Sequence, residues 1–136
     1  MKRRLSLVLF PLWLAGALAL ASCAATAASV SFAEPLNGAT VSTTFAVKFA
    51  VEGMEVKPAG ELSATTGHHH LIIGDGPVAA GEVVPFDDRH IHFGKGQSEA
   101  MVTLAPGSYR LTLQFANGAH QSYGEAMSKT ITINVK

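Results

Sequence analysis

The chain has 136 residues and no formal net charge, because ten basic side chains balance ten acidic ones. Three of the ten basic residues lie in the first four positions, and without them seven basic residues face ten acidic ones, a net charge of −3. After residue 4 the sequence has no lysine or arginine run and no basic stripe, which excludes the electrostatic surface that nucleic-acid binding requires.

The first element in chain order is an export signal. Met1-Lys2-Arg3-Arg4 precedes an apolar stretch over residues 5–21, which ends in small residues. A basic start followed by an apolar centre and small residues is typical of a cleaved signal peptide rather than a permanent membrane helix. We therefore predict that residues 1–22 are removed. Taking 22 residues from 136 leaves 114, the size of one domain.

The end of this segment, Leu20-Ala21-Ser22-Cys23, resembles the lipobox of bacterial lipoproteins, in which the cysteine is acylated and becomes the mature N-terminus. We expect Cys23 to be a lipid anchor, which places the protein in the periplasm or cell envelope and on a membrane. Ordinary signal peptidase cleavage near residues 25–27 is the alternative. In both cases the folded domain has no cysteine for a disulfide, a thiolate nucleophile or a thiolate zinc site.

After a tether over residues 23–29, apolar and polar residues alternate with the period of two that is typical of half-buried strands. Turn residues separate the alternating segments, and no segment has a helical period. We therefore predict an all-β, immunoglobulin-like antiparallel sandwich of about seven strands over residues 30–136, with a small cupin-like barrel as the alternative. The predicted strands cover residues 30–32, 44–51, 68–73, 89–93, 98–104, 109–115 and 130–135.

Several motifs of the mature chain carry a resemblance to a known family. They are Phe32-Ala33-Glu34-Pro35, Gly67-His68-His69-His70-Leu71, His90-Ile91-His92-Phe93-Gly94-Lys95-Gly96-Gln97 and Leu104-Ala105-Pro106-Gly107. Together they resemble the bacterial family called domain of unknown function 4399, over nearly the whole mature chain. The resemblance implies a small exported β-domain, and it brings no established activity or ligand residues.

Five of the six histidines fall in two clusters, at residues 68–70 and 90–92, and the sixth follows a predicted turn at residues 117–118. Residues two apart on a strand share a face, so two imidazoles of one strand can converge on an ion. With Leu71, Ile91 and Phe93 in the core, His69 also faces the core and the other clustered histidines face away from it. Neutral imidazoles bind copper or zinc without a thiolate. The predicted ligands are His68, His70, His90, His92 and His120.

Carboxylates near the clusters are candidates for orienting the imidazole rings through hydrogen bonds, and they are Asp75, Asp87 and Asp88. The alternative is a structural network, in which backbone carbonyls and these aspartates satisfy the histidines without any ion. Three methionines, at positions 54, 101 and 127, are weaker thioether candidates for copper(I).

The sequence thus predicts a lipid-anchored envelope module that binds copper or zinc and meets an unknown envelope protein. A structural or protein-interaction module with a histidine hydrogen-bond network is the alternative. The sequence has neither a Gly-x-Ser-x-Gly elbow nor a His-Glu-x-x-His helix motif. The one enzymatic mechanism that remains is activation of water by a metal on three histidines, and we favour a binding module over it.

Overall fold

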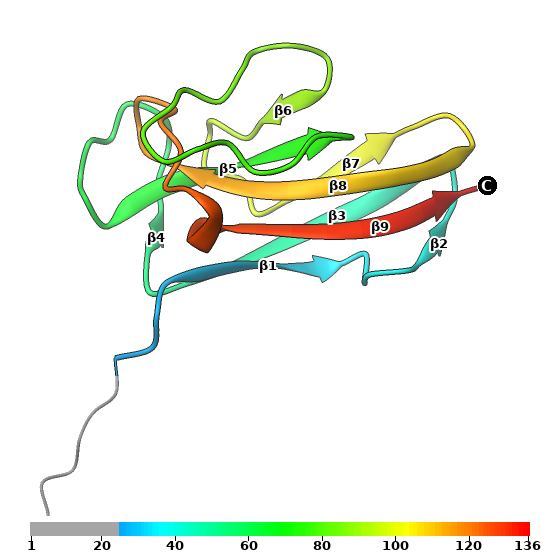
Figure 1. Ribbon diagram of the computed structural model, residues 1–136, viewed down its shortest axis with the longest axis horizontal. Helices are drawn as coiled ribbons and strands as arrows, with labels where there is room; N and C mark the ends of the chain where they lie inside the picture. Colours follow the sequence, from blue (N-terminus) through cyan, green and yellow to red (C-terminus); the bar gives the residue numbers. More distant parts are fainter. Residues whose placement is uncertain (1–24) are drawn as a thin grey trace, which may run out of the picture.

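The computed structural model describes residues 25–136, which form two β-sheets packed face to face (Figure 1). The predicted signal peptide and the Cys23 anchor lie outside these residues. Among residues 25–136, no helix is both long enough and apolar enough to cross a membrane.

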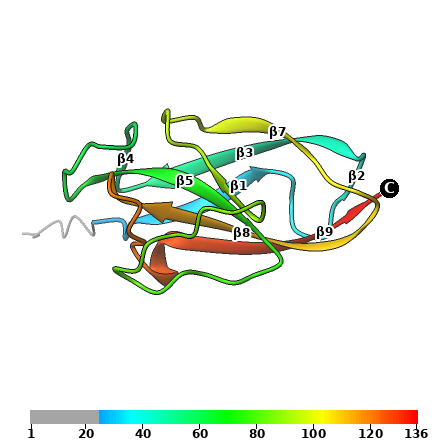
Figure 2. The ribbon, with the colours of Figure 1, turned by 90° about the horizontal axis from the view of Figure 1, so that it is seen from above.

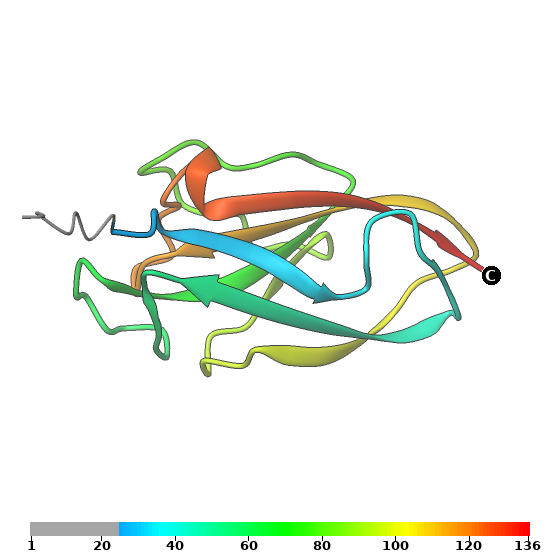
Figure 3. The ribbon, with the colours of Figure 1, turned by 90° about the horizontal axis from the view of Figure 1, so that it is seen from below.

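The smaller sheet has the strand order β1-β3-β7, and both of its strand pairs are antiparallel. Its strands are β1 (Ser29–Glu34), β3 (Thr44–Glu52) and β7 (Glu99–Thr103). Figure 3 shows β1 and β3 side by side, with β7 on the far side of β3.

The larger sheet has the order β2-β9-β8-β5-β4, and β6 also pairs with β5. A single turn of 3-10 helix, η1 (Glu125–Met127), leads into its last strand. The strands are β2 (Thr40–Val41), β4 (Glu55–Val56), β5 (Thr66–Ile73), β6 (His90–His92), β8 (Gly107–Ala116) and β9 (Ser128–Val135).

The predicted β-sandwich is confirmed, and each of the seven predicted strands corresponds to an observed one. The prediction missed the two-residue strands β2 and β4, which are too short to show any alternation. Their pairings are also the exception to the antiparallel arrangement, because β2 runs parallel to β9 and β4 runs parallel to β5.

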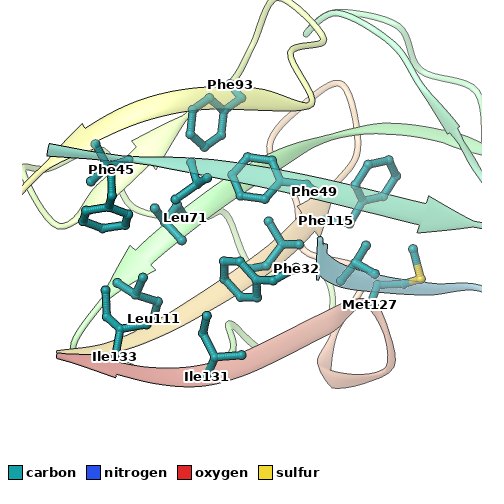
Figure 4. Packing of buried hydrophobic residues seen from close by; sticks show 14 of the residues in the cluster. Phe32, Phe45, Phe49, Leu71, Phe93, Leu111, Phe115, Met127, Ile131 and Ile133 are labelled. Atoms are coloured by element: carbon teal, nitrogen blue, oxygen red, sulfur yellow. The ribbon is translucent and has the colours of Figure 1, made fainter. Parts of the chain in front are cut away.

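The hydrophobic core lies between the two sheets (Figure 4). Along β3, Phe45, Val47 and Phe49 are buried, and their alternation with more exposed neighbours is the pattern of a strand with one core face. Ile131 and Ile133 of β9 face the same core. Full burial of a side chain of this size contributes roughly 1.5–3 kcal/mol relative to leaving it in water. The core therefore fixes which face of each strand points outward.

Strand β5 is buried on both faces, and this positions the histidines. Its inner face contacts the core, whereas on its outer face the His120 ring of the 117–124 loop lies 5.0 Å from His68 and 5.9 Å from His70, and the segment after β5 packs against neighbouring β8. These two segments are tied to each other, since the Val84 amide donates to the His120 carbonyl at 2.9 Å and the Ser122 amide donates to the Glu82 carbonyl at 2.8 Å. Figures 1 and 2 show the green segment after β5 passing beside β8 before it reaches β6. Polar side chains on this outer face are therefore enclosed.

Candidate metal centre

Four histidines converge on the outer face of β5. The strands β5 and β6 are antiparallel neighbours, and their register places His70 directly opposite His92. His68 shares the face of His70 because the two residues are two apart on one strand. The loop after β8 adds His120. One ring nitrogen from each of His68, His70, His92 and His120 lies within 4.8 Å of the others, and we call these four residues the histidine quartet.

Burial differs across the quartet. His68 is 0% exposed and His70 is 1% exposed. His92 and His120 are partly exposed. The quartet therefore has a closed side, formed by β5, and a side that faces solvent, formed by β6 and the loop.

The position of His120 depends on a turn organised by Asn117. The Asn117 side-chain oxygen accepts hydrogen bonds from the amides of Ala119 at 2.9 Å and Gln121 at 3.0 Å. The His120 amide donates to the Asn117 carbonyl at 2.9 Å. His120 has a φ of 65°, a conformation that few residues other than glycine adopt. Such backbone strain persists where the surrounding contacts hold it, and it concentrates at functional sites.

Two residues of the surroundings shape the position of His92. Its imidazole lies so close to Gly94 that a Cβ atom on Gly94 would overlap the ring. The Phe86 ring lies 5.3 Å from the His92 ring and 5.1 Å from the His120 ring, measured between centroids, although Phe86 itself is 65% exposed. Phe86 was not predicted from the sequence, because a phenylalanine in a polar loop carries no specific signal for a site.

The quartet lacks the hydrogen bonds that buried imidazoles normally make. Within residues 25–136, both ring nitrogens of His70 are buried without a hydrogen-bond partner, and so is the Nδ1 atom of His68 and of His92. The exception is the bond between His68 Nε2 and His120 Nδ1 at 3.0 Å. A buried polar atom without a partner costs about 1–3 kcal/mol, so a group that satisfies these nitrogens would bind favourably.

Burial also favours the neutral form of three quartet members, His68, His70 and His92. Loss of solvation, followed by the charge of neighbouring imidazoles, lowers the pKa of His68 to about 4 and the pKa of His70 to about 2. The pKa of His92 is lowered by the same two causes. A neutral imidazole keeps one nitrogen lone pair, which is the form that binds a metal ion.

These lowered pKa values predict that acid destabilises the metal-free chain. In the unfolded chain a histidine has a pKa of about 6.5, so below pH 6.5 the unfolded state binds protons that buried His68, His69 and His70 do not. We expect the free energy of unfolding to fall as the pH falls from 6.5 toward 4, by up to about 1.4 kcal/mol per pH unit for each histidine. Urea unfolding at pH 7 and pH 5 measures this change. An equal urea midpoint at the two pH values would contradict it.

His90 does not join the quartet, contrary to the prediction. The antiparallel register places His90 opposite Ile72, two residues along β6 from the His70–His92 pair. Its Nδ1 atom donates to the Asp87 carboxylate at 2.6 Å, and this bond is the main reason that the pKa of Asp87 is lowered. His90 and Asp87 thus form a separate pair beside the site.

The predicted carboxylates do not contact the quartet, although Asp87 bonds to the ring of His90, another predicted ligand. Asp75 pairs with Arg89 at 3.3 Å, and the second hydrogen bond to Asp87 comes from the Arg89 amide at 2.9 Å. Asp88 is exposed. In the described part of the chain, no hydrogen bond joins Asp75, Asp87 or Asp88 to a quartet ring.

His69 faces the core, as the strand phase predicts. It is 0% exposed and lies between Phe49 and Phe115, with ring centroids 5.1 Å and 5.0 Å away. Its two ring nitrogens have no hydrogen-bond partner within the described residues. Of the methionines, Met127 is part of the core and Met54 packs against it, so both lie on the opposite face of the sheet from the quartet.

Comparison with known proteins gives one match. Residues 47–136 match the profile of a family described as "Domain of unknown function (DUF4399)". This range contains all four histidines of the quartet. No curated protein and no solved structure matches the chain.

Proposed function

Because this chain belongs to the DUF4399 family, whose description gives no activity, we propose from the chemistry of the quartet that it binds one copper(II) or zinc(II) ion. The ligands are one nitrogen from each of His68, His70, His92 and His120. Imidazole nitrogen is a preferred ligand of both ions, and neither ion requires a thiolate.

The observation that carries the proposal is the absence of hydrogen-bond partners, among the described residues, for buried nitrogens of the quartet. His70 is the clearest case, since both of its nitrogens are buried and unpartnered. A metal ion would form a bond to one nitrogen of each ring. Buried nitrogens that have no partner in the metal-free chain would then have a metal bond, and this change is favourable.

The spacing of the quartet fits an ion after a small contraction. Nitrogens that bind zinc at 2.0–2.1 Å lie about 3.3 Å apart in a tetrahedron, and opposite nitrogens of a planar copper(II) site lie about 4 Å apart. The candidate nitrogens are all within 4.8 Å of one another. His92 and His120 are partly exposed, so their rings have freedom to move toward an ion.

The proposal also includes a cellular location for the protein. The basic and apolar start of the chain and the Leu20-Ala21-Ser22-Cys23 motif support export and acylation of Cys23. The protein would then be held on a membrane of the cell envelope, where it would meet an envelope protein that supplies or receives the ion. A site made of imidazoles alone suits an oxidising compartment, because it has no thiol to oxidise.

A second candidate is a structural or protein-interaction module in which the histidines form a hydrogen-bond network. Two contacts favour it, the His68–His120 bond and the His90–Asp87 pair. However, a network that stabilises the fold would satisfy its most buried members, and within the described residues it leaves His70 without a partner. A metal site therefore explains the unpartnered nitrogens of His70 better than a hydrogen-bond network does.

Isothermal titration of the chain without residues 1–23 tests the proposal. Both sheets and the core lie within the residues that remain. We expect one copper(II) or zinc(II) ion per chain, and no such binding in a His70→Ala, His92→Ala double variant, which keeps four other histidines as a control for weak surface binding. Binding no stronger than that of a histidine-poor protein, or equal binding by the double variant, would disprove it.

A further inference from the structure

The donor set of the quartet contains no negative charge. Its four members are imidazoles, and within residues 25–136 no carboxylate belongs to the group. Two acidic residues, Asp87 and Asp88, lie close to His92 in the sequence. The Asp87 carboxylate already accepts hydrogen bonds from His90 and from the Arg89 amide. A divalent ion in the quartet would therefore keep its full charge of +2. A charge that is not compensated is costly in a partly buried site, because the surroundings solvate it less than water does.

The geometry leaves room for one more ligand on one side. His68 and His70 close the side of β5, whereas His92 and His120 are partly exposed. An additional ligand can therefore reach the ion from the side of β6 and the loop. The Phe86 ring lies beside both partly exposed histidines, so a small ligand fits there more readily than a bulky one.

We propose that the ion in the quartet takes one small monovalent anion from solution, such as a halide or a carboxylate, as an additional ligand on the side of His92 and His120. This inference rests on the proposed function. The anion compensates half of the charge of a divalent ion, and its coordination position lies where the quartet faces solvent.

Azide is a suitable probe, because it is a small anion whose binding to copper(II) produces a charge-transfer absorption band. The chain without residues 1–23 is loaded with one equivalent of copper(II) and titrated with azide, with visible absorption and electron paramagnetic resonance as the readouts. We expect a saturable band that corresponds to one azide per copper, together with a shift of the resonance spectrum. The His70→Ala, His92→Ala double variant should show neither change.

The outcomes separate this inference from the proposed function. Stoichiometric copper binding with spectra that azide leaves unchanged would overturn the anion site and leave the metal site standing. If azide binds to an Asp87→Asn variant but not to the wild-type chain, the Asp87 carboxylate is the additional ligand, and the proposal of an anion from solution is wrong. Absence of copper binding in the titration would overturn both.

Discussion

Replacing His70 with leucine should make the metal-free chain more stable and should abolish its stabilisation by metal. His70 is 1% exposed, and both of its ring nitrogens lack a hydrogen-bond partner within residues 25–136. Leucine has a similar volume and no polar side-chain atoms, and the substitution removes no side-chain hydrogen bond of His70 within the described residues. We expect the free energy of unfolding of the metal-free chain to rise by about 1–3 kcal/mol.

With metal bound, the wild-type chain should be more stable than the His70→Leu variant. An ion that binds the folded chain alone stabilises it by about 4 kcal/mol when its free concentration is 1,000 times the dissociation constant. The wild-type chain should gain this stabilisation, and the His70→Leu variant should not. Urea unfolding with and without copper(II) or zinc(II) measures both effects in one series.

His69→Leu is a matched control for this prediction. His69 is adjacent to His70, is equally buried and has two unpartnered ring nitrogens, but it faces the core between Phe49 and Phe115. Its replacement should also stabilise the metal-free chain, while stabilisation by metal should persist. A His70→Leu variant that loses more than about 1 kcal/mol in the metal-free state would show that the His70 nitrogens are satisfied, and would contradict our account of the site.

Much of the fold was predictable because each long strand has one face in the core. The alternation of Phe45, Val47 and Phe49 specifies β3 without knowledge of its neighbours, and all three residues are buried as expected. The strands β2 and β4 have two residues each, so their pairing depends on where the longer strands place the backbone. The alternation of apolar and polar residues therefore does not predict the pairings of β2 and β4.

Strand phase also separated His69 from His68 and His70, because neighbours on a strand point to opposite faces. It could not separate His90 from His92, which share one face. The register of β5 and β6 makes that choice, since it pairs His70 with His92 and Ile72 with His90. Register depends on contacts between strands, and one sequence alone does not reveal it.

The positions of side chains in the loops could not be predicted from the sequence. His120 was a candidate from the sequence, but its position results from the hydrogen bonds of Asn117 and from the Val84 amide, which is 36 residues away along the chain. Asp87 bonds to the His90 ring and Asp75 pairs with Arg89, so neither carboxylate orients a ring of the quartet. Proximity along the chain indicated the Asp87–His90 pair but not the pairing of Asp75 with Arg89.

His92 and His90 provide the sharpest test of the site. They are two residues apart on β6 and share one face, yet His92 belongs to the quartet and His90 pairs with Asp87. His92→Ala removes one of four ligands and should weaken metal binding by at least about 100-fold, or about 2.8 kcal/mol. His90→Ala leaves the four ligands in place and should change the affinity by no more than about threefold, less than 0.7 kcal/mol.

A competition titration that measures copper(II) affinity against a chelator of known strength, for the wild-type chain and for these two variants, tests the central claim most directly. The quartet predicts wild-type affinity in His90→Ala and a loss of at least about 100-fold in His92→Ala. Equal losses in both variants, or a loss in His90→Ala alone, would show that the ion is not held by His68, His70, His92 and His120.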